Sequence, residues 1–176
     1  TSFDRTVYYI NCPSGGLTAA NEILQDIVFN ALIPEEEFKA EQEVIRREIS
    51  MGRDDADKVA SQEMFSTCYC RHPYGLPVIG YLENFNNLKR SDVQNYYLER
   101  YVTDNIFIVI SGDLDLEKVK SQVSTLYGEV RRSSSSPVFI PPEPVQLGRR
   151  DSFIEYTNPI TRLWMSWKIP SITDPD

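Results

Sequence analysis

The run at residues 105–110, Asn-Ile-Phe-Ile-Val-Ile, constrains the fold of this chain more than any other segment. An apolar run of this length is typical of a strand that is buried on both faces, which requires helices packed on a sheet. Three further segments are strand candidates, at residues 5–11, 152–157 and 161–169. In the last of them the apolar residues alternate, which predicts one buried face.

Helical patterns separate these strand candidates. Apolar residues recur at steps of three and four through residues 17–29, and Pro34 followed by three glutamates predicts the start of a second helix that runs to about Met51. Further helices are predicted at residues 56–69, at 91–101 and before Gly128. The sequence therefore predicts an α+β fold, with helices packed on a mixed or antiparallel sheet.

The composition and segment order limit the domain organisation and the partners. A length of 176 residues suits one domain, in which residues 1–132 precede a Ser/Pro-rich linker at 133–150 and late strands at 151–176. The net charge of −8 argues against nucleic acid as a partner, and no apolar stretch is long enough to span a membrane. We therefore expect a soluble protein, and its three cysteines suit a cytoplasmic or a periplasmic location equally.

The helix predicted after Pro34 carries two acids in an unexpected position. On a helical wheel, Glu41 and Glu48 fall between Val44 and Ile45, inside the apolar stripe. A buried carboxylate without a partner is destabilising by several kcal/mol, so such residues usually find a cation or bind a metal. We therefore expect a positive group against this face.

Two kinds of positive group fit this pattern. One is an arginine, which would make the chain a protein-binding domain with a plain buried ion pair; Arg5, Arg71 and Arg162 are the candidates. The other is a metal ion, since one carboxylate and neutral imidazoles form a catalytic zinc site that a second acid can support from about 10 Å along the helix. Because the chain has a single histidine, the imidazoles would come from outside it.

A competing metal site at Cys68, Cys70 and His72, with Cys12 as a fourth ligand, has less support. The spacing differs from that of the common zinc modules, and residues two apart near a helix end point in different directions. We expect reduced, partly buried thiols and a structural hydrogen bond for His72.

Several motifs together resemble the pitrilysin/insulinase family of zinc metallopeptidases, which includes the mitochondrial processing peptidase. They follow in order along nearly all of the chain: Thr1–Tyr9 (TSFDRTVYY), Glu41–Ile49 (EQEVIRREI), His72–Gly75 (HPYG), Tyr101–Asn105 (YVTDN) and Ser111–Asp115 (SGDLD). The resemblance implies that zinc is held by two histidines of an H-x-x-E-H helix and by a glutamate of a downstream helix. Glu48 matches this ligand, and Glu41 matches a second glutamate that supports the site without touching the metal.

The resemblance also implies partners. A peptide or protein substrate would add as an extended strand, with Thr1 and Ser2 at the border of its binding strand, and a second pitrilysin-like repeat or subunit would close over it. The chain contains no H-x-x-E-H, which the family pattern places upstream of Thr1. We therefore expect a segment of the first α/β repeat, truncated at its N-terminus and inactive by itself, from a peptidase parent. The alternative is a non-catalytic homologue that acts as a scaffold or partner subunit.

Overall fold

The computed structural model describes residues 1–176 except 131, 172–173 and 175–176. Residue 131 belongs to the predicted range 1–132 and the other four belong to the predicted range 151–176, so the predictions for these five positions lie outside the described residues. The chain forms two compact units, which are described separately below. The first combines residues 1–41 with 87–138, and the second combines residues 42–86 with 139–176. Among the described residues, no helix is long and apolar enough to cross a membrane.

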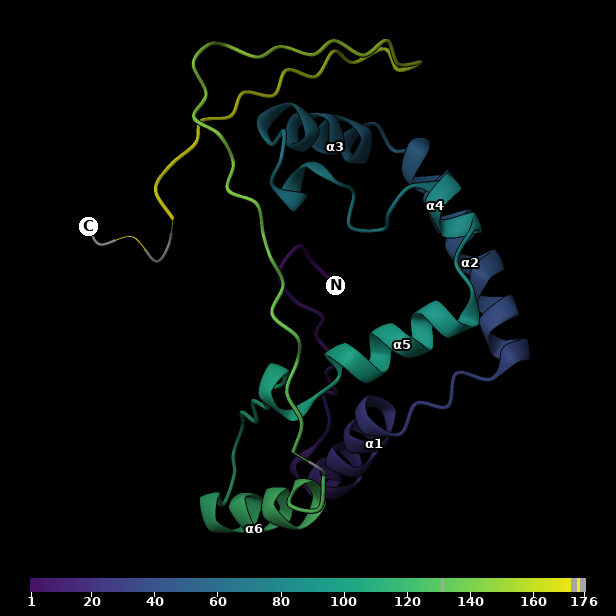
Figure 1. Ribbon diagram of the computed structural model, residues 1–176. Helices are drawn as coiled ribbons and strands as arrows, with labels where there is room; N and C mark the ends of the chain where they lie inside the picture. Colours follow the sequence, from purple (N-terminus) through teal and green to yellow (C-terminus); the bar gives the residue numbers. More distant parts are fainter. Residues whose placement is uncertain (131, 172–173, 175–176) are drawn as a thin grey trace. The chain divides into compact units, whose positions relative to one another are not determined.

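The main helices lie where the sequence predicts them (Figure 1). Each boundary falls within about two residues of the expected one, because caps, prolines and apolar spacing act locally. A short helix, α4 (Leu82–Asn86), was not predicted. The other α-helices are α1 (Leu17–Phe29), α2 (Glu35–Arg53), α3 (Ala56–Cys68), α5 (Arg90–Arg100) and α6 (Leu116–Tyr127).

The predicted sheet is absent from the described part of the chain. Residues 5–11, 106–110, 152–157 and 161–169 are not helical, and Asn105 ends the 3-10 helix η3 (Thr103–Asn105). None of the four predicted segments pairs with a neighbouring segment as a strand. The prediction of helices packed on a sheet is therefore wrong for this structure. The reason is that an apolar run reports strand propensity, whereas a strand also needs a hydrogen-bonding neighbour.

Burial shows the same discrepancy. Phe107 and Val109, which the run at 105–110 predicts to be buried, are 82% and 77% exposed. The alternating residues of the last segment, predicted to form a buried face, are also exposed: Leu163, Met165, Trp167 and Ile169. Without a covering layer among the described residues, the apolar side chains of these segments remain in contact with solvent.

In the first unit, α1 packs against α6 and α5. The Gln122 amide donates to Thr18 Oγ1 at 2.7 Å, and the rings of Phe29 and Tyr127 meet edge to face at 6.2 Å. From α5, the Tyr97 hydroxyl donates to the Val28 carbonyl at 2.9 Å and accepts from the Ala31 amide at 3.2 Å. These contacts hold α1 at both of its ends.

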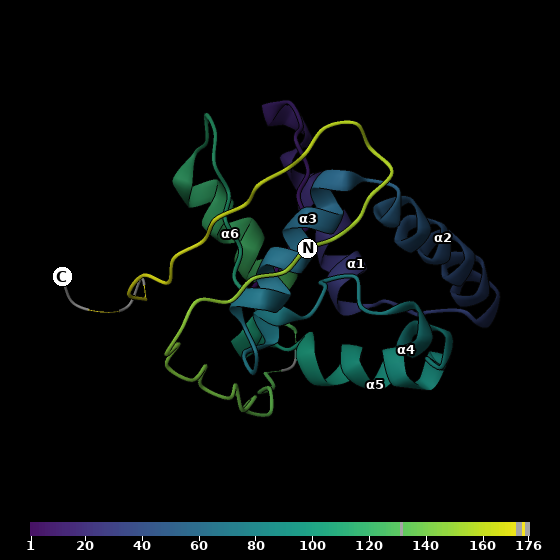
Figure 2. The same cartoon turned by 90° about the horizontal axis from the view of Figure 1, so that it is seen from above.

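In the second unit, the loop after α3 folds back onto that helix. The His72 Nδ1 atom accepts from the Tyr74 amide at 3.2 Å and caps the 3-10 helix η2 (Pro73–Gly75), which confirms the predicted structural hydrogen bond. Gly75 is buried beneath the Tyr69 carbonyl group. Beyond residue 143 the chain runs along α3 and returns, as Figures 1 and 2 show.

The start of α3 gives a first testable prediction. Asp55 accepts hydrogen bonds from the Lys58 and Asp57 amides, and these bonds hold the pKa of its carboxyl below the ordinary value. A lowered folded-state pKa stabilises the protein above the unfolded-state pKa of about 4, and this contribution is lost as the pH falls through the folded-state pKa. We expect Asp55→Ala to lower the urea midpoint at pH 7 and to lower it by less at pH 3, below the unfolded-state pKa.

The control for this prediction is Asp54→Ala, which removes a neighbouring exposed acid outside the cap. It should leave the midpoint close to that of the wild type at both pH values. A constant difference between Asp55→Ala and wild type across this pH range would contradict the capping role.

Candidate functional site

The two acids predicted to lie inside an apolar stripe are on α2, and both are exposed. The prediction that they are buried is therefore wrong. The helix buries a narrower arc than the wheel suggested: Ile49 is 6% exposed, whereas Val44, which borders both acids on the wheel, is 51% exposed. No described segment covers the Val44 side of the helix closely enough to bury it.

Neither Glu41 nor Glu48 forms an ion pair within the described residues. Of the arginine candidates, Arg162 binds Asp57 instead, with Nε to Oδ1 at 2.6 Å. On α2 itself, Arg46 pairs with Glu43. The hypothesis of a plain buried ion pair therefore has no support, and an exposed carboxylate does not by itself require a cation.

The described residues do not form a complete metal site. They contain no group of three or more His, Cys, Asp or Glu side chains arranged to hold an ion, which removes the support for the competing site around Cys68. All three cysteines are free, and Cys12 and Cys70 are exposed rather than partly buried. An exposed carboxylate at Glu48 suits a ligand supplied to a site whose other ligands lie elsewhere.

The remaining predicted site residues lie at the start of the chain. Thr1 and Ser2 are exposed, and the Ser2 amide donates to the Arg5 carbonyl at 2.8 Å. Thr1, Ser2 and Glu41 belong to the first unit, and Glu48 belongs to the second.

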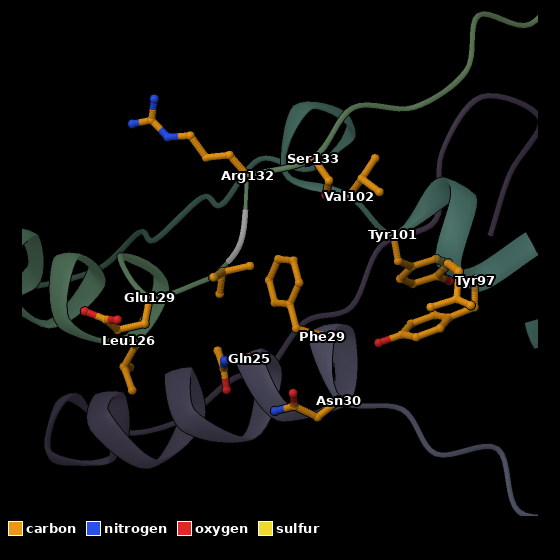
Figure 3. A pocket seen from close by; sticks show the side chains of 12 residues that line it. Gln25, Phe29, Asn30, Tyr97, Tyr101, Val102, Leu126, Glu129, Arg132 and Ser133 are labelled. Carbon is orange, nitrogen blue, oxygen red and sulfur yellow. The ribbon is translucent and has the colours of Figure 1, made fainter.

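The first unit contains a cavity of about 660 Å³ that none of the predicted site residues lines. Figure 3 shows the rings of Tyr97 and Tyr101 on one side of it, with Arg132 extending away. The Tyr101 hydroxyl lies 2.7 Å from the Tyr8 hydroxyl, and burial raises the pKa of Tyr101 above its ordinary value. Tyr101 is therefore protonated at neutral pH and is a poor candidate for a general base.

One polar cluster in the second unit was not predicted from the sequence. Glu143 Oε1 accepts from the Cys70 amide at 2.9 Å, and Oε2 accepts from the amides of His72 at 3.0 Å and Arg71 at 2.8 Å. These backbone bonds hold the pKa of Glu143 well below its usual range. The residue lies between prolines in a stretch that composition marks as a linker, so no local pattern distinguished it.

Two family models match adjacent parts of the chain. Residues 1–81 match the insulinase model, Peptidase family M16, and residues 87–176 match the model of the Peptidase M16 inactive domain. The first match contains both Glu41 and Glu48, and the second contains Glu143.

The curated relatives carry peptidase names. The chain is 27% identical, over its full length, to a probable mitochondrial-processing peptidase subunit beta of Arabidopsis thaliana and to the mitochondrial-processing peptidase subunit beta of Saccharomyces cerevisiae. It is 26% identical, over 77% of its length, to an uncharacterized zinc protease of Rickettsia felis. It spans only 34%, 39% and 33% of these relatives, respectively. From the two model matches and these similarities, we conclude that the chain belongs to the insulinase family of peptidases, M16.

Proposed function

We propose that this chain is a segment of a zinc-dependent metalloendopeptidase, in which Glu48 is a metal ligand. The observation that carries the proposal is the insulinase-family match over residues 1–81, which includes the helix with Glu48 and Glu41. The name of the Rickettsia felis relative, a zinc protease, supports zinc as the metal. The exposure of the Glu48 carboxylate leaves it accessible to an ion held by residues outside the described structure.

The chain supplies one part of the chemistry. When bound in such a site, zinc is a Lewis acid that lowers the pKa of a water molecule for attack on a peptide carbonyl. Glu48 would bind the metal through its carboxylate, and Glu41, two turns earlier on α2, would help to orient the site. A general base and two imidazole ligands would come from an H-x-x-E-H helix that this sequence does not contain.

The same proposal covers the substrate and the partner. A peptide or protein substrate would bind as an extended chain bordered by Thr1 and Ser2, which are both exposed. A second pitrilysin-like repeat or subunit would complete the enzyme, in keeping with the subunit names of the Arabidopsis and yeast relatives. Residues 133–150 would link the two parts of this repeat.

A non-catalytic homologue is the second candidate. It is favoured by one observation, the match of residues 87–176 to a model described as the inactive domain of the family. The gene sequence upstream of Thr1 separates the candidates, because an H-x-x-E-H motif there supports the enzyme and its absence supports a scaffold or partner subunit.

A direct test uses the 176-residue chain by itself. We expect it to show no zinc-dependent peptidase activity, because its described residues hold no complete metal site. The measurement is cleavage of a fluorogenic peptide library with and without added zinc, with the natural protein as the positive control. Chelator-sensitive cleavage by the chain alone would contradict the placement of the remaining ligands outside it.

A further inference from the structure

The Glu143 carboxylate is the centre of a polar cluster in the second unit. Its side chain is 10% exposed, and both oxygens are used by the Cys70, Arg71 and His72 amides. Three successive amides that converge on one carboxylate form a strong anion site, here filled by the chain's own side chain. We call this cluster, together with Arg150 and Lys168, the Glu143 clasp.

The two cations of the clasp also bind α3 or the loop that follows it. Arg150 Nη1 lies 3.5 Å from Glu143 Oε1 and donates to the carbonyls of Thr67 and Cys68, at 3.3 and 2.9 Å. A cation at the C-terminal end of a helix complements the helix dipole. Lys168 Nζ lies 3.4 Å from Glu143 Oε1 and 5.4 Å from the centre of the Tyr69 ring.

Between these two cations, residues 150–168 fold back on themselves along α3 without strand pairing between the two legs. We call this segment the hairpin. Its outward leg starts at the C-terminal end of α3, where Arg150 binds the Cys68 carbonyl. Further along this leg, the Ser152 hydroxyl donates to the Glu63 carboxylate, and the Tyr156 hydroxyl donates to the Arg53 carbonyl at 2.9 Å. Its return leg starts with the Arg162 to Asp57 pair at 2.6 Å and ends at Lys168. Figure 1 shows both legs beside α3.

The hairpin thus connects the clasp to the helix that carries Glu48. Arg53 is the last residue of α2, and Glu48 lies five residues before it. Only Asp54 and Asp55 separate α2 from α3. Contacts therefore follow one another from the clasp, along the hairpin, to the C-terminal end of α2.

We propose that Glu143 is a positioning residue, which fastens the hairpin along α3 and thereby fixes the C-terminal turns of α2, where Glu48 lies. This inference rests on the proposed role of Glu48 as a metal ligand. Glu143 touches neither substrate nor metal, and its contribution is to hold the backbone that presents the ligand. Supporting groups of this kind typically change metal affinity by about 10- to 100-fold when they are replaced.

Glutamine at position 143 tests the clasp with little change in shape. One orientation of its amide places an NH₂ group against the Cys70 amide and both cations, and the other places it against the Arg71 and His72 amides. Neither orientation reproduces the carboxylate, because each sets donors against donors. Glu155→Gln is the matched control, since it removes the same charge from an exposed position of the same hairpin.

The experiment measures two quantities in the natural protein that carries this sequence. The first is the exchange rate of the Cys70, Arg71 and His72 amides, measured by hydrogen exchange with mass spectrometry on peptides that contain them. The second is the zinc dissociation constant, measured by competition with a chromophoric chelator. For Glu143→Gln we expect exchange to accelerate about tenfold and the zinc dissociation constant to rise about tenfold. Lys168→Gln keeps the three amide bonds and should shift both quantities in the same direction by less, which provides a folded variant if Glu143→Gln does not fold.

The outcomes separate this inference from the proposed function. Unchanged exchange at Cys70–His72 would overturn the clasp, and faster exchange with a wild-type zinc constant would overturn its positioning role. If Glu155→Gln matched Glu143→Gln in both measurements, the effect would be one of charge alone and the inference would fail. Normal zinc binding by Glu48→Gln would instead remove the proposed ligand, whatever the exchange data show for the clasp.

Discussion

Glu48→Gln is expected to abolish zinc retention and peptidase activity in the natural protein that carries this sequence. A neutral amide is a much poorer ligand for a divalent cation than a carboxylate, and loss of a direct ligand should exceed the roughly 100-fold upper range for supporting groups. The change should leave the fold intact, because the Glu48 side chain is exposed and forms no ion pair in the described part of the chain. Zinc content per protein after dialysis and kcat/KM on a peptide substrate are the measurements.

Glu43→Gln is the matched control for this substitution. Glu43 is an exposed acid on the same helix, and its ion pair with Arg46 is of the surface kind that contributes little to stability. Its replacement should preserve both zinc content and activity. Normal zinc content in Glu48→Gln would remove Glu48 from the metal site, and equal losses in both variants would indicate a general effect of charge on α2.

Gly75→Ala is expected to destabilise the protein by about 2 kcal/mol, in the range for forced overpacking. An added Cβ would overlap the Tyr69 carbonyl oxygen, which belongs to the backbone and cannot rotate away as a side chain can. Relief would require the loop that carries the Cys70–His72 amides to move from α3, although the Gln62 amide also holds this loop through the Gly75 carbonyl at 3.4 Å. The free energy of unfolding, from urea denaturation, is the measurement.

Gly15→Ala is the control for Gly75→Ala. Gly15 also lies in a short 3-10 helix, η1 (Ser14–Gly16), but a Cβ there would meet nothing within 4 Å. Its free energy of unfolding should stay within about 0.5 kcal/mol of wild type. A Gly75→Ala variant as stable as Gly15→Ala would show that the loop accommodates a side chain.

The sequence predicted the helices of this chain because the signals for a helix are local. Pro34 and the glutamates after it predict the start of α2, and apolar spacing predicts the extent of α1, in each case from a few neighbouring residues. A strand depends on a partner that no local pattern supplies. The run at 105–110 therefore has the composition of a buried strand, yet residues 107–109 are exposed and the run pairs with no strand in the described structure.

The candidate site shows the same division between local and distant information. The helical wheel correctly placed Glu41 and Glu48 on one side of α2, but it overestimated how much of that side is buried, because burial depends on what covers the helix. The proposed role of Glu48 as a ligand therefore rests on the family match that includes this residue rather than on the energetics of a buried charge. Glu143 was missed because its partners are about 70 residues away in sequence.

The Glu143 clasp has a practical consequence for dividing the protein. The gap between the two family matches, residues 82–86, is an obvious place at which to separate two expression fragments. A cut there would send the carboxylate to one fragment and its three amide donors to the other. The fragment ending before residue 82 would then expose an empty anion site, and the other would expose an acid that had lost its amide partners, so the pair should be produced as one polypeptide.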